Sequence, residues 1–135
     1  MKIKICIVVA NYYPDISREL LNGTKYLLNK NKKIQYKVIY APGIFEIPFI
    51  ISKNINKYDG FIALGCVVKG QTSHFELITK ATTYSIMDLS IKYKKPIGNG
   101  IISCFNKKQA KERSSLLKKN KGREAAKAII SVLGL

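Results

Sequence analysis

Short apolar runs alternate along this chain with longer segments whose apolar residues recur at helical spacing, and this alternation constrains the fold more than any other feature. The first run, Ile3–Val9, is apolar almost throughout, as expected for a strand buried on both faces of a sheet. Further strands are predicted at Ile34–Tyr40, Asp59–Val68 and Ile97–Cys104. Because strands that alternate with helices form parallel sheets, we expect an α/β fold, a three-layer sandwich whose four-stranded parallel sheet has helices on both faces.

The segments between these strands carry helix signals. Asp15 is expected to cap a first helix, and Pro48 suits the first turn of a second helix that runs to about Asn56. A third helix is predicted from near Thr72 to about Ile91. These three segments connect the four strands in chain order.

Two more helices are predicted after the last strand. Asn106 is expected to cap the first of them, which carries Ala110 and Leu116. Gly122 is expected to interrupt the pattern before a last helix that carries Ala125. With 135 residues and no internal repeat or linker, the chain is expected to form one domain, residues 1–135.

The charge of the chain leaves two interpretations open. The net charge is +16, and all but three of the 24 basic residues are lysines. Such a charge suits a polyanion such as nucleic acid, but it also suits a lysine-rich solvated surface. The basic residues are spread along the chain without the glycine and aromatic pattern of an RNA-binding sheet, which favours the solvated surface.

The cysteines and the start of the chain bear on its compartment. Cys6, Cys66 and Cys104 are odd in number and lie in apolar runs, which predicts reduced, buried thiols rather than disulfides. One histidine and three scattered cysteines have no zinc-type spacing, so neither a metal nor another cofactor is expected. Met1 leads almost directly into the first strand, and no apolar run is long enough to span a membrane. We therefore expect a cytoplasmic protein.

The predicted topology also indicates where a site would lie, since open parallel sheets bind ligands beyond the carboxyl ends of their strands. His74, the only histidine of the chain, follows the third strand at this edge. It comes shortly after Gly70-Gln71-Thr72, a segment that suits one phosphate at a helix start, although many such starts bind nothing. His74 is expected one helical turn inside that helix, where an imidazole suits proton transfer, with a purely structural histidine as the alternative.

Three other features are candidates for ligand contacts. Tyr12 follows the first strand and suits stacking on a flat heterocycle, or simply packing at the rim. The turn Pro42–Pro48 exposes backbone amides beside Glu46, which suits a polyhydroxylated chain, although Glu46 also complements a helix dipole. Arg113 is one of few arginines, which suits bidentate anion binding or a surface salt bridge.

Four motifs in order make the chain resemble the lumazine synthase family from Lys4 onward. They are P-G-I-F-E-I-P at 42–48, L-G-C-V-V-K-G-Q-T-S-H-F-E at 64–76, Q-A-K-E-R at 109–113 and N-K-G-R-E-A-A at 120–126. The resemblance implies a flavodoxin-like fold in pentamers, with active sites between neighbouring subunits. It also implies a transferase of riboflavin biosynthesis that condenses 5-amino-6-(D-ribitylamino)uracil with 3,4-dihydroxy-2-butanone 4-phosphate, without metal or cofactor, and releases phosphate and water.

The resemblance also implies a role for each matching residue. His74 matches the residue that transfers protons. The residues that match contacts to the ribitylaminouracil are Tyr12, Ile44, Phe45, Glu46, Cys66, Val67, Val68 and, from the adjacent subunit, Asn99. The residues that match contacts to the phosphate of the second substrate are Gln71, Thr72, Lys121 and, from the adjacent subunit, Arg113.

A few positions depart from the commonest pattern of the family. Tyr12 replaces a phenylalanine or tryptophan, Lys69 an arginine and Asn99 a phenylalanine, and Leu117 stands where a second lysine is common. The segment before the first strand is short, so we expect a pentamer or a pair of pentamers rather than a shell of sixty subunits. A downstream riboflavin synthase is a possible partner. The alternatives are a pentameric riboflavin synthase of archaeal type and a basic nucleic-acid-binding module.

Overall fold

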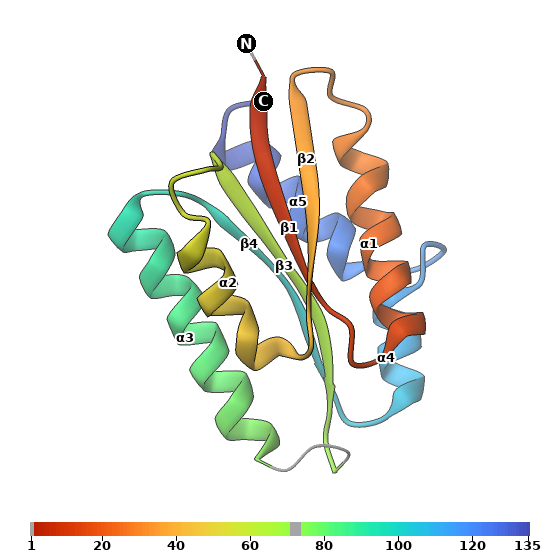
Figure 1. Cartoon of the computed structure of the whole chain (residues 1–135). Helices are drawn as coiled ribbons and strands as arrows, with labels where there is room; N and C mark the ends of the chain where they lie inside the picture. The colour runs from red at the N-terminus through yellow and green to blue at the C-terminus, as the bar shows by residue number, and fades with distance from the viewer. Residues whose placement is uncertain (1, 71–73) are drawn as a thin grey trace.

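The fold is built on four parallel strands, as the apolar runs predict (Figure 1). The structure, a computed structural model, describes residues 2–70 and 74–135. The strands are β1 (Ile3–Ala10), β2 (Ile34–Ala41), β3 (Gly60–Val68) and β4 (Ile97–Cys104), in the spatial order β2-β1-β3-β4. Every neighbouring pair is parallel, so all four carboxyl ends lie at one edge of the sheet.

Helices cover both faces of this sheet and give the expected three layers (Figure 1). The helices are α1 (Pro14–Leu28), a 3-10 turn η1 (Ile44–Glu46), α2 (Ile47–Lys53), α3 (Phe75–Tyr93), α4 (Lys107–Ser114) and α5 (Lys121–Val132). α1, α4 and α5 pack on one face, and α2 and α3 pack on the other.

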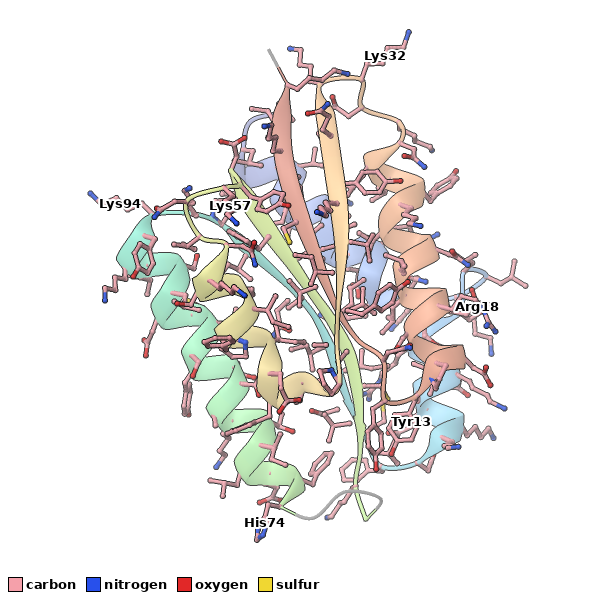
Figure 2. All side chains as sticks on the ribbon, viewed as in Figure 1. Tyr13, Arg18, Lys32, Lys57, His74 and Lys94 are labelled. Atoms are coloured by element: carbon pink, nitrogen blue, oxygen red, sulfur yellow. The ribbon has the colours of Figure 1, made fainter. Side chains whose placement is uncertain are left out.

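Figure 2 shows how the ends of the sheet differ. Lys32, Lys57 and Lys94 lie at one end of the molecule, and His74 lies at the other, beyond the carboxyl end of β3. These lysines are therefore remote from the edge of the sheet where a ligand is expected.

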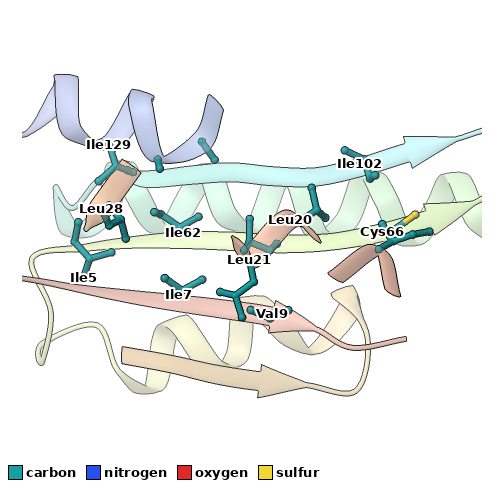
Figure 3. Packing of buried hydrophobic residues seen from close by; sticks show 14 of the residues in the cluster. Ile5, Ile7, Val9, Leu20, Leu21, Leu28, Ile62, Cys66, Ile102 and Ile129 are labelled. Carbon is teal, nitrogen blue, oxygen red and sulfur yellow. The ribbon is translucent and has the colours of Figure 1, made fainter. Parts of the chain in front are cut away.

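Two apolar cores lie on the two faces of the sheet because side chains alternate along each strand. In β1, Ile5 and Ile7 face α1 and α5, while Cys6 and Val8 face α2 and α3. Figure 3 shows the first core, in which leucines of α1 and Ile129 of α5 lie over isoleucines of β1 and β3. All nine residues of β3 are buried, as expected for a central strand of a parallel sheet.

The ends of the first two helices differ from the expectation. Tyr13 rather than Asp15 is the N-cap residue of α1, because Pro14 occupies the first turn with its backbone already suited to a helix. Asp15 lies inside that turn and pairs with Arg18 at 3.5 Å. α2 does carry Pro48 in its first turn but ends at Lys53, where the side-chain amide of Asn54 donates to the carbonyl of Ile50 at 2.8 Å.

The last two helices also correct the sequence prediction. Asn106 caps α4 as expected, accepting from the backbone N–H of Gln109 at 2.9 Å, but α4 ends at Ser114, so Leu116 lies outside it. Gly122 does not interrupt a helix; it lies in the first turn of α5. A side chain at Gly122 would collide with the Leu20 carbonyl of α1, so this glycine permits the two helices to approach closely.

Cys6, Cys66 and Cys104 are buried and free, as predicted. Within residues 2–70 and 74–135, no helix has the length and apolarity required to cross a membrane.

Candidate active site

A pocket of about 280 Å³ lies at the carboxyl edge of the sheet, where the topology predicts a site. Residues that follow β1 and β2 meet the end of β3 and the first turn of α3 there. The pocket is lined by Tyr12, Pro42, Gly43, Ile44, Phe45, Glu46, Cys66, Val67 and Ile78. Six of the eight residues expected to contact the ribitylaminouracil therefore line one cavity.

Tyr12 is held at the rim by the hydrogen bonds of the turn that carries it. The Ser17 hydroxyl donates to the Ala10 carbonyl at 2.6 Å, and the Asn11 N–H donates to the Ala41 carbonyl at 2.9 Å. The Tyr12 ring meets Tyr13 edge-on, with 4.9 Å between the ring centroids, and 58% of Tyr12 is exposed. A largely uncovered aromatic ring at a pocket rim suits stacking on a planar ligand.

The turn between β2 and α2 is buried at Ile44 and exposed at Phe45. Ile44 is buried against β3 at Gly65, where an added Cβ would lie 2.7 Å from Ile44. Its carbonyl accepts from the Thr82 hydroxyl of α3 at 3.5 Å. Phe45 is 62% exposed and Glu46 is half-buried at the pocket. The anchored Ile44 thus sets the positions of an aromatic ring and a carboxylate.

The end of β3 forms the inner wall of the pocket. Cys66 and Val67 line it, with 5% and 4% exposure, whereas Val68 is buried and does not line it. Cys66 carries a thiol and Val67 is apolar, so this part of the pocket suits the face of a ring rather than a charged group.

His74 corrects the expectation that it lies one turn inside a helix. It is the exposed N-cap residue of α3, directly before Phe75, and adopts the left-handed conformation with φ 59°. Its side chain points away from the helix end in Figure 2. Histidine is among the few non-glycine residues that are enriched in this conformation. Gln71 and Thr72, the predicted phosphate contacts, lie outside the described residues.

The other expected residues lie outside this pocket. Arg113 and Lys121 meet in a separate hollow of about 230 Å³, lined by Ile102, Arg113, Lys119, Lys121 and Glu124. Asn99 lies in a third hollow beside α5, and its side-chain oxygen accepts from the Ile101 N–H at 3.0 Å. The three hollows share no lining residue, so Asn99, Arg113 and Lys121 do not contribute to the pocket of their own chain.

Cys66 lines the pocket, Arg113 lines the hollow that also contains Lys121, and Cys104 contacts Arg113. Arg113 Nη1 donates to the Ser103 carbonyl at 2.8 Å and lies 3.9 Å from Cys104 Sγ. The neighbouring Cys66 thiol, with the positive charge of Arg113 and against the effect of burial, lowers the pKa of Cys104 from 9.0 to about 7. The neighbouring Cys104 thiol, together with burial, raises the pKa of Cys66.

Metal ligands are not grouped in the described part of the chain. Among residues 2–70 and 74–135, no three histidine, cysteine, aspartate or glutamate side chains are placed to hold a metal ion together.

The sequence comparisons decide the family. Residues 2–135 match the family model described as 6,7-dimethyl-8-ribityllumazine synthase. The chain belongs to the lumazine synthase family.

Lumazine synthases from several bacteria are similar to the chain over nearly their whole length. A protein named 6,7-dimethyl-8-ribityllumazine synthase from Bartonella henselae is 41% identical, over 99% of this chain and 88% of the relative. The protein of the same name from Agrobacterium fabrum is 37% identical, over 97% of this chain and 93% of the relative. Family membership confirms the resemblance inferred from the four motifs, and the four-stranded parallel sheet agrees with the predicted flavodoxin-like sandwich.

Sequence reasoning missed part of what the structure brings together. Ile78 completes the pocket from the first turn of α3, and only the helical spacing from His74 hints at it. Lys119 and Glu124 lie beside Arg113 and Lys121. Lys119 was hidden in a run of lysines, where no spacing marks one member.

Proposed function

We propose that this chain forms 6,7-dimethyl-8-ribityllumazine in riboflavin biosynthesis, by condensing 5-amino-6-(D-ribitylamino)uracil with 3,4-dihydroxy-2-butanone 4-phosphate and releasing phosphate and water. The observation that carries the proposal is one pocket that unites Tyr12, the turn 42–46 and the end of β3 in a member of the lumazine synthase family. It acts as one domain in the cytoplasm and supplies a downstream riboflavin synthase.

The pocket suits the ribitylaminouracil. The exposed ring of Tyr12 stacks on the pyrimidine, and Cys66 and Val67 form the wall beside it. The ribityl chain lies along Ile44, Phe45 and Glu46, where a carboxylate and backbone amides are available to hydroxyl groups. The wall is mostly apolar with few polar groups, which is typical of sites that orient a small ligand.

Orientation supplies most of the catalysis, because an amine and a ketone are reactive once they are held together. The amine attacks the ketone, and water is lost to form an imine. Phosphate is then eliminated to leave an enol that tautomerises to a carbonyl, and the second nitrogen attacks this carbonyl and closes the ring with loss of a second water. His74 transfers protons in these steps, and its exposed ring at the start of α3 is accessible to them. Gln71 and Thr72 are assigned to the phosphate by their match to the family motif.

Each active site is completed by a neighbouring subunit of a pentamer or a pair of pentamers. The separation of Asn99, Arg113 and Lys121 from the pocket of their own chain supports this arrangement, in which Arg113 and Lys121 bind the phosphate at the next subunit. α3 also exposes Leu77, Tyr84, Met87 and Ile91. Large apolar side chains exposed along one helix are typical of an interface.

A condensation assay tests the proposal directly. The purified protein, given both substrates, is expected to form a product with the ultraviolet absorbance of a lumazine. Tyr12→Ala is expected to raise the KM for the pyrimidine substrate, whereas Tyr26→Ala, which removes a similarly exposed tyrosine from α1, is expected to leave it unchanged. The proposal would be contradicted if the protein made riboflavin from added lumazine but formed no lumazine from the two substrates.

A further inference from the structure

Arg113 is held at the end of β4 by one of its nitrogens. Nη1 donates to the Ser103 carbonyl at 2.8 Å and to Cys104 Sγ at 3.9 Å. In the part of the chain that the structure describes, Nη2 and Nε of Arg113 have no such partner. A guanidinium held at one nitrogen keeps its other N–H groups for an anion in a defined direction.

The acceptor sulfur is itself placed by a second thiol. Cys66 and Cys104 belong to the same core, on neighbouring parallel strands, with Cys66 opposite Ile102 and Cys104 opposite Val68. Each thiol shifts the pKa of the other, upward for Cys66 and downward for Cys104, so the two side chains interact. Such diagonal neighbours have Cα atoms roughly 7–8 Å apart, which is beyond the usual reach of a disulfide. The two thiols are therefore free neighbours rather than a covalent pair.

Charge strengthens this arrangement. Cys104 is 1% exposed and accepts a hydrogen bond from Arg113 on α4, and Cys66 on β3 also lowers its pKa. Lys107 on α4 adds a positive charge near Cys66. The Cys66 thiol and the Arg113 guanidinium lower the pKa of Cys104, which favours its ionised form. A hydrogen bond from guanidinium to an ionised acceptor is stronger than one to a neutral thiol.

We propose that Cys104 is a positioning residue for Arg113, and that Cys66 aligns the Cys104 sulfur as the acceptor. The proposal rests on the proposed function, which assigns Arg113 to the phosphate of the butanone substrate at the neighbouring pocket. Cys66 also lines the pocket of its own chain, so the two sulfur atoms connect one pocket to the arginine that serves the next.

Steady-state kinetics of Cys104→Ala separate positioning from a structural role. This variant is expected to raise the KM for the butanone phosphate roughly tenfold, the usual effect of losing one hydrogen bond to a charged group, with little change in the KM for the pyrimidine. Cys104→Ser, which keeps an acceptor, is expected to recover part of the loss. Cys6→Ala is the matched control, because Cys6 is equally buried but lies on the opposite face of the sheet.

The pH dependence adds a readout that packing alone does not move. In the unsubstituted chain the KM for the butanone phosphate is expected to rise as pH falls through about 7, because Cys104 becomes a neutral and weaker acceptor. Cys104→Ala is expected to lose this part of the profile, and Cys66→Ala to move it to higher pH. The proposal would be overturned if Cys104→Ala changed the KM for the butanone phosphate and the KM for the pyrimidine equally. It would also be overturned if the pH profile of Cys104→Ala were identical to that of the unsubstituted chain.

Thiolate absorbance in the ultraviolet provides a test that does not depend on the reaction. Titration of the folded protein is expected to show a thiolate with a pKa of about 7 that is lost in Cys104→Ser and raised in Arg113→Ala. Calorimetry with inorganic phosphate is expected to show weaker binding in Cys104→Ser. If the thiolate titrates as expected but the protein forms no lumazine, the proposed function alone is refuted. If the thiolate titration of Arg113→Ala is the same as that of the unsubstituted chain, the Cys104–Arg113 contact is refuted.

Discussion

At the scale of single residues, the conformation of His74 determines how its role is best tested. Its left-handed backbone is tolerated by asparagine but costs alanine about 1–2 kcal/mol, so His74→Ala changes stability together with chemistry. His74→Asn removes the imidazole ring and keeps the backbone conformation, which makes it the cleaner variant.

His74→Asn is expected to lower turnover roughly 10- to 10⁴-fold, a range that allows for the intrinsic reactivity of the substrates. Turnover is measured with both substrates at saturation, and thermal unfolding is expected to match that of the unsubstituted chain. Unchanged turnover would remove His74 from the mechanism.

Cys6 carries a pH-dependent contribution to stability. Burial raises the pKa of this thiol from 9.0 to about 11 in the folded state. Between these values the unfolded chain loses the proton first, so the free energy of unfolding falls as pH rises from 9 towards 11. Cys6→Ala is expected to flatten this part of the profile. Urea unfolding of both chains at a pH below 9 and at a pH near 11 measures the difference, and parallel profiles would contradict it.

At the scale of elements, Asn120 joins three helices. Its side-chain oxygen accepts from the Arg123 N–H at 2.9 Å and caps α5, while its amide donates to the carbonyls of Ser114 at 2.7 Å and Glu19 at 2.8 Å. Asn120 is fully buried, and it lies where an added Cβ on Gly23 of α1 would collide with it. The motif N-K-G-R-E-A-A that supports family membership is thus partly architectural.

Asn120→Ala is expected to cost about 2–4 kcal/mol of unfolding free energy, because it leaves buried carbonyls unsatisfied as well as an uncapped helix. Asn106→Ala, which removes an exposed cap from α4, is expected to cost about 1 kcal/mol. Urea unfolding of the two variants measures the contrast. Equal losses would mean that the amide hydrogen bonds of Asn120 contribute nothing beyond the cap.

The strands were predictable to within a residue or so because each segment rich in strand-forming residues ends close to a turn signal, such as Pro42 after β2 or Gly70 after β3. Helix ends were less predictable: Asp15 and Asn106 carry the same kind of local cap signal, but Pro14 displaced the first cap. Gly122 looked like a helix breaker because sequence alone does not reveal that α1 lies against it.

At the scale of the whole molecule, the proposed function requires one chain to hold two halves of different sites. The pocket with Tyr12 is one half, and the hollow with Arg113 and Lys121 is the other. A ring of identical subunits joins such halves, because a head-to-tail interface places one surface of each chain against a different surface of the next.

Mixing two inactive variants tests this arrangement. His74→Asn and Arg113→Ala chains, unfolded and refolded together in equal amounts, are expected to recover about a quarter of the activity, since a random ring leaves that share of its interfaces with both halves intact. Each variant refolded alone is the control. Activity no greater than the average of the two controls would show that each site belongs to one chain.

The sequence by itself determined the alternation of strands and helices, the edge of the sheet that holds the pocket, and most of the pocket wall, because apolar periodicity and the position after a strand are local properties. Only the tertiary structure decided that His74 precedes α3 rather than lying within it, and that Arg113 rests on Cys104 away from the pocket of its own chain. Those outcomes depend on which surfaces meet when the helices pack on the sheet, and such contacts join residues whose separation along the chain carries no periodic signal.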